Sequence, residues 1–287
     1  MFVKYEEFFC RAKNLADLFL DTFNDSFEFP QYWLEGLRES PILGCGKSAE
    51  CVSGGDHYSI VSLGGGPGFD YVSAAVATSF CSYVDSLRED EASRLKLQAT
   101  ILDYEEGWSD LVRAMADSTQ TLLDQSNSSL KCDWGGKCDI TKSIVHPSNA
   151  AVLLLLDSTN LWTCQYCVAE NAHNLKESNY VFFRELFRYA RQGSIFVLSE
   201  VHPRLWPDFY NLMQEENFCI QEVGFNKKGK QMLFRKSSSA TQRKSGPIMS
   251  EIDRRQLAKF EEMGKYHERK IKVGWQRQES KIRGAKD

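Results

Sequence analysis

The sequence predicts an α/β fold with a doubly wound, mostly parallel sheet that ends in an antiparallel hairpin. From Tyr58 onward, short apolar runs alternate with stretches of helical periodicity, which is the pattern of βαβ units. Later, residues 218–223 and 230–234 form two apolar runs separated by Asn226-Lys-Lys-Gly229, a turn sequence that favours a hairpin. Together these patterns predict a mixed sheet of about six or seven strands.

The same alternation gives the expected elements in order. Apolar runs predict strands at 58–63, 99–103, 150–157 and 194–199. Apolar residues that recur every three and four positions predict helices at 71–87, 108–123, 180–190 and 206–216.

Length and composition are typical of a globular protein with a substantial core. The 287 residues are 42% hydrophobic and 26% charged, which suits one large domain with extensions. The first nine residues lack the layout of a signal peptide, and the longest apolar run, 150–156, is too short to cross a bilayer. Nine scattered cysteines are typical of reduced thiols. We therefore expect a soluble protein of the cytoplasm or nucleus with no membrane partner.

Four segments are expected along the chain. They are an N-terminal helical cap (1–54), the sheet domain (55–236), a Ser-rich linker (237–249) and a basic helical tail (250–287). Ser250, with Asp253 three residues later, predicts the N-cap of the tail helix. From Arg243 to the end, 13 Lys and Arg stand against 7 Asp and Glu, whereas residues 1–242 have 22 against 32. The tail is basic and the body is acidic.

The stretch "SLGGGPGFDY", residues 62–71, places glycines between a strand and a helix. The first N–H groups of that helix lack partners within it, and glycines allow a ligand to approach them closely. Gly64, Gly66 and Gly68 form a G-x-G-x-G pattern. A dinucleotide motif would have a further glycine at the position of Phe69.

A strand, G-x-G-x-G, a helix and then a strand ending in an acid resemble the class I S-adenosylmethionine-dependent methyltransferases. The resemblance covers about residues 55–236. It implies that S-adenosylmethionine is the cofactor and that its methionine part passes over the glycine turn. The implied cofactor-binding residues are Gly64, Gly65, Gly66, Gly68, Asp103 and Asp139. Among them Asp103 matches the acid that grips the ribose, and Asp139 matches the residue near the adenine.

The resemblance leaves two residue assignments open and does not hold at one position. Asp85 is the ribose acid if "SFCSYVD" is the second strand, although "LQATILD" has the higher β-propensity. Asp133 lies close to Asp139 and competes for its role. Many family members carry an acid two residues before the first glycine, which reaches toward the methionine end, and this chain has Ser62 there.

The expected fourth strand supplies the candidate catalytic residue, Asp157. The run "NAAVLLLLDSTN" places Asp157 at the carboxyl end of that strand, where open α/β sheets bind ligands. Enzymes that methylate the amino groups of adenine or cytosine commonly show Asn- or Asp-Pro-Pro-aromatic here, and Asp157-Ser-Thr-Asn160 does not match. Cys164 and Cys167 form a tight C-x2-C pair, but a four-cysteine zinc site needs two such pairs. The spacing of Cys132 and Cys138, C-x5-C, is too loose for the second, so no metal is expected.

These observations predict a methyltransferase whose acceptor is RNA in preference to protein or small molecules. The preference rests on the basic tail, which contains Tyr266 and Trp275 and could track phosphates and stack bases. One alternative is a non-catalytic binding module that keeps the fold, prompted by Ser62. Another is a nicotinamide-dependent oxidoreductase, prompted by the glycine turn and Asp103, although Phe69 counts against it.

Overall fold

The computed structural model describes residues 57–73, 96–123, 129–215, 218–226, 229–237 and 247–283. The predicted helical cap (1–54) and Asp85 lie outside the described residues, as does the expected 71–87 helix beyond Ser73. The described start of that helix is Phe69.

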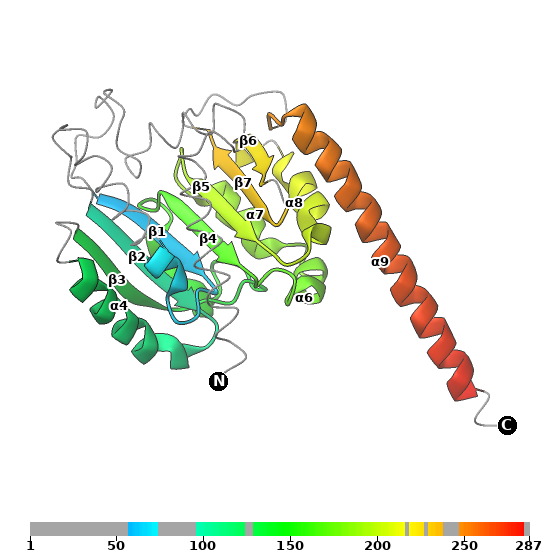
Figure 1. Cartoon of the computed structure of the whole chain (residues 1–287), viewed down its shortest axis with the longest axis horizontal. Helices are drawn as coiled ribbons and strands as arrows, with labels where there is room; N and C mark the ends of the chain where they lie inside the picture. The colour runs from blue at the N-terminus through cyan, green and yellow to red at the C-terminus, as the bar shows by residue number, and fades with distance from the viewer. Residues whose placement is uncertain are drawn as a thin grey trace.

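One seven-stranded sheet forms the centre of the protein (Figure 1). Its strands are β1 (His57–Leu63), β2 (Lys96–Asp103), β3 (Ser129–Lys137), β4 (Leu161–Gln165), β5 (Ile195–Ser199), β6 (Ile220–Phe225) and β7 (Gln231–Lys236). They lie in the order β3-β2-β1-β4-β5-β7-β6. β1 to β5 are parallel, and β7 is antiparallel to both β5 and β6. The predicted doubly wound sheet with a terminal antiparallel hairpin is confirmed.

The strand order places the switch point between β1 and β4. The chain moves outward from β1 through β2 to β3 and then returns to the other side of β1. Loops at the carboxyl ends of β1 and β4 therefore diverge, and open α/β sheets bind their ligands in the crevice so formed.

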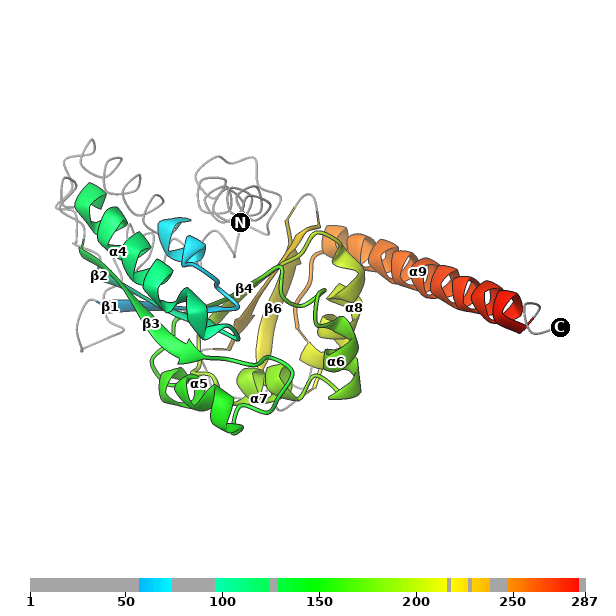
Figure 2. The same cartoon turned by 90° about the horizontal axis from the view of Figure 1, so that it is seen from below.

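Helices lie on both faces of the sheet (Figure 2). They are α4 (Ser109–Leu123), α5 (Ala150–Leu155), α6 (Ala172–Glu177), α7 (Val181–Tyr189), α8 (Trp206–Met213) and α9 (Glu251–Arg283). α4 covers one face beside the 69–73 helix, and α5 and α7 cover the other. An aromatic cluster packs beneath α7 and α8, with Phe187 of α7 in edge contact with Phe196 of β5 and Phe234 of β7. These helices explain the 3.6-residue periodicities of the sequence.

The predicted strand at 150–157 is wrong. Residues 150–155 form α5, and β4 is the later run "LWTCQ". The physical reason is composition, because Ala and Leu favour helix, whereas strands favour β-branched and aromatic residues. Leu154 is 84% exposed, so the apolar run does not mark a buried element throughout.

None of the strands expected from the sequence lies at the position of β3, Ser129–Lys137. Its sequence, "SLKCDWGGK", contains two adjacent glycines that weaken any strand pattern. A Cβ at Gly135 would lie 2.4 Å from Cγ2 of Thr100 on the neighbouring β2. Glycine is therefore required there by the close approach of β2.

The tail helix α9 packs against the body through its first half. Asp253, Leu257 and Phe260 are buried, at helical spacing, and the ring of Phe260 meets that of Phe225 edge-on. The described side chains from Lys265 to Lys270 are exposed. Figures 1 and 2 show the second half of α9 extending away from the sheet domain. Within the described residues, no helix combines the length and apolar character needed to cross a membrane.

The N-cap of α9 also anchors the helix to the sheet. Ser250 Oγ accepts a hydrogen bond from the Asp253 N–H at 3.1 Å, which confirms the predicted cap. Asp253 in turn accepts the N–H of Phe225 on β6 at 3.0 Å. The predicted linker (237–249) has a structured end, because Ile248 and β6 exchange backbone hydrogen bonds and Met249 is buried.

We expect Asp253→Ala to destabilise the protein by about 1–2 kcal/mol, because it leaves the buried N–H of Phe225 without an acceptor. Urea denaturation of the full chain measures the change. Glu251→Ala is the matched control, since Glu251 is exposed in the same helical turn and its pair with Arg255 is exposed too. Equal effects of the two substitutions would contradict an anchoring role for Asp253.

The same anchor predicts a pH dependence. Burial raises the pKa of Asp253, against the lowering effect of its hydrogen bonds from Ser250 and Phe225. A raised pKa in the folded state means that stability from this group is highest below the ordinary carboxyl pKa and falls as the pH rises through the raised value. Asp253→Asn, which does not titrate, should therefore lose this fall when unfolding free energies are compared across that pH range.

Candidate functional site

The glycine turn after β1 forms the centre of the candidate site. Gly64, Gly66 and Gly68 have positive φ angles of 64°, 51° and 95°, a conformation that residues with a Cβ rarely adopt. The N–H groups of Gly64 and Gly65 bind the carbonyl of Leu102 on β2. The turn therefore leans against the end of β2, at the carboxyl edge of the sheet.

Close packing beneath the turn also requires glycine. A Cβ at Gly64 would lie 2.2 Å from Sγ of Cys167, and one at Gly65 would lie 2.5 Å from Oγ of Ser62. The turn is thus seated directly on the ends of β1 and β4.

Asp103 ends β2 beside this turn. Its Oδ2 accepts the N–H of Gly66 at 2.8 Å, and its Oδ1 accepts the N–H of Glu105 at 3.0 Å. A carboxylate offers about four lone-pair sites, so about two remain. Those two suit a pair of neighbouring hydroxyls, such as the ribose diol that the resemblance assigns to this residue.

Asp139 lies two residues beyond β3, on the loop at the same edge. Its Oδ1 accepts hydrogen bonds from the backbone N–H and the hydroxyl of Thr141, and its own N–H binds Oδ1 of Asn149. Asn149 is fully buried and also donates to three backbone carbonyls of the loop. The loop that would face an adenine is therefore built around Asn149, a residue that belongs to no motif in the sequence. Asp133, the competing acid, is exposed on β3.

A group of buried polar side chains at the switch point escaped prediction from the sequence. Asp70 is 2% exposed and accepts hydrogen bonds from the hydroxyls of Ser62 and Thr163, each at 2.6 Å, and from Nε2 of Gln165. Ser199, at the end of β5, is in register with Gln165. Asp70 is visible within "SLGGGPGFDY", but its link to β4 depends on the true position of β4, which the strand prediction at 150–157 misplaces.

Asp157 does not lie at the candidate site. It follows α5 and precedes β4, so it lies near the amino end of β4, where it is exposed. The residues at the carboxyl end of β4 are Gln165, Tyr166 and Cys167. The prediction of Asp157 as a catalytic residue is therefore wrong, and its cause is the misplaced strand.

Three thiols lie under the glycine turn. Cys164 is fully buried, and its hydrogen bond with Cys167, together with desolvation, raises its pKa. Burial raises the pKa of Cys138 as well. A thiol held protonated is a poor nucleophile, so Cys164 is suited to packing. Among the described residues, no cluster of His, Cys, Asp and Glu side chains could hold a metal ion.

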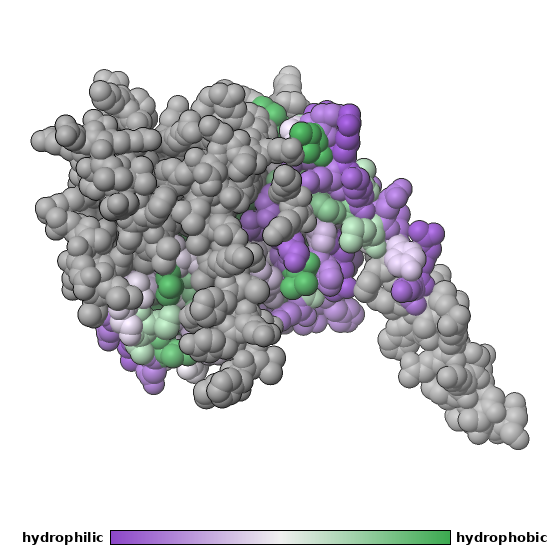
Figure 3. Space-filling model, in the orientation of Figure 1, coloured by the Kyte–Doolittle hydropathy of each residue, from purple (hydrophilic) through white to green (hydrophobic). Residues whose placement is uncertain are grey.

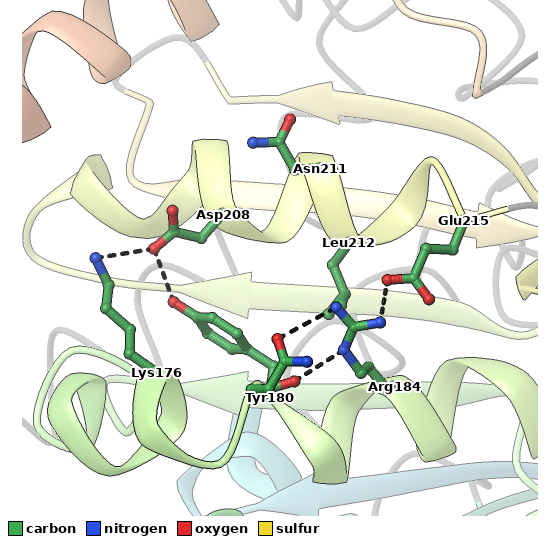
Figure 4. A pocket seen from close by; sticks show the side chains of 8 residues that line it. Lys176, Tyr180, Arg184, Asp208, Asn211, Leu212 and Glu215 are labelled. Atoms are coloured by element: carbon green, nitrogen blue, oxygen red, sulfur yellow. Dashed lines mark hydrogen bonds and ion pairs between the residues drawn. The ribbon is translucent and has the colours of Figure 1, made fainter.

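A separate pocket of about 290 Å³ lies between α7 and α8 (Figure 4). Its four charged side chains form two pairs of opposite charge, Lys176 with Asp208 and Arg184 with Glu215. The hydroxyl of Tyr180 donates to Asp208 at 2.7 Å. These pairs join α6, α7 and α8 and neutralise one another, so the pocket shows no charge preference for a ligand.

The sheet order, the glycine turn and the acid after β2 form the arrangement that the resemblance to class I S-adenosylmethionine-dependent methyltransferases implies. The chain is similar to a SAM-dependent methyltransferase from Aquifex aeolicus (13% identity, 62% of this chain and 80% of that one, TM-score 0.36). It is also similar to one from Methanosarcina mazei (12%, 64% and 95%, TM-score 0.41) and to a predicted O-methyltransferase from Agrobacterium tumefaciens (12%, 71% and 89%, TM-score 0.36). No protein-family model and no curated protein matches. The fold assignment rests on the strand order.

Proposed function

We propose that this protein is an S-adenosylmethionine-dependent methyltransferase. The observation that supports it most is the hydrogen bond from the N–H of Gly66 to Asp103, which joins the glycine turn after β1 to the acid that ends β2. The geometry places a glycine-rich turn, with three glycines at positive φ, next to a carboxylate that has acceptor sites left after its two backbone hydrogen bonds. The turn lies at the switch point and Asp103 ends the neighbouring strand, at the carboxyl edge of the sheet, where doubly wound sheets bind their ligands.

The residues present fit this cofactor. Asp103 offers acceptors to the ribose hydroxyls, and the glycine turn leaves room for the chain that links ribose and amino acid. Two buried side-chain oxygen atoms at the carboxyl ends of β4 and β5, Oε1 of Gln165 and Oγ of Ser199, have no hydrogen-bond partner among the described residues. Unpaired buried polar atoms are rare in native proteins, and a polar ligand supplies the missing partners.

The bound cofactor would supply a methyl group on a sulfonium: in an in-line displacement the acceptor would bond to the methyl carbon as the S–CH3 bond breaks, and the neutral thioether would leave. The protein's task is then to hold the acceptor and the methyl group in line, because positioning supplies much of the rate. Rigidly held residues are suited to that task. Residues 165–167 at the end of β4 are held in this way, because the N–H of Tyr166 donates a hydrogen bond to the carbonyl of Ser199 on β5 at 2.7 Å.

Isothermal titration of the full chain with S-adenosylmethionine tests the proposal. We expect a single site whose affinity for NADH is far weaker. No detectable binding of the cofactor would refute the proposal. Tight NADH binding would favour the oxidoreductase, and cofactor binding without methyl transfer to any cellular fraction would favour the non-catalytic binding module.

We also propose that the acceptor is RNA and that the second half of α9 binds it. Between residues 265 and 283 the sequence has seven Lys and Arg against two Glu, a net charge of +5. Residues 251–264 have three Lys and Arg against four acids, a net charge of −1. The positive charge is thus concentrated on the half of the helix that leaves the body, where it is free to follow a phosphate backbone.

Exposed groups on the described part of this segment suit the same role. Tyr266 is 57% exposed, and the ammonium of Lys270 lies over its ring, 5.3 Å from the centroid. Aromatic rings flanked by cations stack nucleic-acid bases. Figure 3 shows that the coloured surface along the first half of α9 is mainly hydrophilic, with single apolar residues between.

We expect the triple substitution of Lys265, Arg269 and Lys270 by Gln to weaken binding of a single-stranded RNA by about 10-fold or more and to reduce the slope of log K against log salt by about 2. Fluorescence anisotropy at several salt concentrations measures both. The matched control replaces Arg254, Arg255 and Lys259, three exposed cations on the docked half of the same helix. Equal losses in both triple variants would contradict a specific role for the extending half.

A further inference from the structure

The buried carboxylate of Asp70 joins the two strands that flank the switch point. Asp70 lies in the first turn of the helix that follows the glycine turn. Its Oδ2 accepts from Ser62 Oγ on β1 and from Thr163 Oγ1 on β4, and its Oδ1 accepts from Nε2 of Gln165 on β4. Burial of a carboxylate is costly unless donors surround it, and here all three donors are side chains of strand residues that point to one face.

The sequence position of the acid differs from that of the resembling family. Many members carry an acid at the position of Ser62, two residues before the first glycine. In this chain that position holds a hydroxyl, which donates to Asp70 at 2.6 Å. The carboxylate of Asp70, eight residues further along the sequence, thus lies within hydrogen-bond distance of the Ser62 side chain.

The amide of Gln165 extends this group toward the ligand edge. Its Nε2 is directed to Asp70, since a carboxylate accepts only from the amide nitrogen. The amide oxygen, Oε1, is consequently the free end, and it is buried without a partner among the described residues. Ser199, whose Oγ likewise lacks a partner there, lies beside Gln165 in the sheet register. The negative charge of Asp70 and the unpaired acceptor Oε1 of Gln165 together favour a cationic ligand group with several N–H donors.

We propose that Gln165 and Ser199 bind the α-ammonium group of S-adenosylmethionine, and that Asp70 is the positioning residue that orients Gln165 and supplies the negative charge. This inference rests on the proposed function, because it assigns the methionine end of that cofactor. Asp70 replaces the acid missing at Ser62. The binding site for the ammonium group is then retained, although the acid is at position 70 and not at position 62.

Two ligands that differ in one group test the assignment. S-adenosylhomocysteine carries the α-ammonium, and its deaminated analogue lacks it. We expect the wild-type chain to prefer S-adenosylhomocysteine by about 10-fold or more in isothermal titration. Asp70→Asn should remove most of that preference, by weakening S-adenosylhomocysteine about 10-fold while the analogue changes by less than about 3-fold. These values follow from a charge-assisted hydrogen bond.

A merely structural role for Asp70 would weaken both ligands equally, and that result would overturn the inference. If Asp70→Asn does not fold, as judged by thermal denaturation, Gln165→Leu replaces it, because it removes Oε1 and leaves the acid in place. It should lose the same preference. Asp110→Asn, an exposed acid on α4, is the control and should bind both ligands like the wild type.

A swap tests this replacement directly. Asp70→Ser should lose the preference, and the double variant Ser62→Asp/Asp70→Ser should recover it to within about 3-fold of the wild type. A folded double variant that still lacks the preference would overturn the idea that the two positions exchange roles. Wild-type protein that binds neither ligand would refute the proposed function itself. Wild-type protein that binds both equally would refute this inference alone.

Discussion

Asp103→Ala is expected to weaken cofactor binding by about 100- to 10,000-fold. The substitution removes two hydrogen bonds to ribose hydroxyls, each worth about 1.5–3 kcal/mol when the acceptor is charged. It also releases the N–H of Gly66, so the glycine turn loses its tie to β2. Isothermal titration with S-adenosylmethionine measures the loss.

A conservative variant and a control make the Asp103 result specific. Asp103→Asn keeps one acceptor for the Gly66 N–H and should therefore retain more of the thermal stability than Asp103→Ala while still binding the cofactor weakly. Asp110→Ala removes an exposed acid on α4 and should change neither property. Asp157→Ala should bind the cofactor like the wild type too, since Asp157 lies at the other end of the strands. Normal binding by Asp103→Ala would exclude Asp103 as the ribose acid.

Gly64→Ala is expected to lower the unfolding free energy by about 2–5 kcal/mol and to abolish cofactor binding. A φ of +64° costs a residue with a Cβ about 1–2 kcal/mol. The new Cβ would also lie 2.2 Å from Sγ of Cys167, and relief of such an overlap costs about 1–3 kcal/mol more. Chemical denaturation of the full chain measures the sum.

Two variants separate the contributions at Gly64. Gly193 has a φ of +79°, and a Cβ added there would meet no atom within 4 Å, so Gly193→Ala should show the conformational cost alone. Cys167→Ala removes the sulfur, and combined with Gly64→Ala it should recover about 1 kcal/mol or more relative to Gly64→Ala. No recovery in this double-mutant cycle would show that the overlap with Cys167 is not the cause.

Elements whose pattern comes from their own local sequence were predicted well. The helix 108–123, the helix 180–190 and the terminal hairpin lie close to α4, α7 and the β6–β7 pair. Their periodicity is a local property of amphipathic helices and turns. β4 was missed for the opposite reason. It is five residues long and buried on both faces, so "LWTCQ" shows no alternation, while the longer Leu-rich run before it gave a stronger but helical signal.

The residues of the candidate site were likewise predicted only where a local sequence pattern reveals them. The glycines and Asp103 follow one another in a short, ordered motif, and the structure brings them together. Asp70 meets Thr163 and Gln165 across more than ninety positions of sequence, and that contact depends on which strand lies next to β1. The order of the strands in the sheet cannot be read from any local sequence pattern. The acid that replaces Ser62 therefore became visible only with the sheet assembled.

Ile248 protects the open edge of the sheet. β6 is the last strand, and its outer backbone groups would be free to pair with another chain. The N–H of Val223 binds the carbonyl of Ile248 at 3.0 Å, and the N–H of Ile248 binds the carbonyl of Gln221 at 2.8 Å. The segment that leads into α9 thus covers the edge of β6 and disfavours aggregation through that edge. Shortening the chain from Lys265 onward would leave this edge covered, whereas a cut before Ile248 would expose β6 and favour self-association.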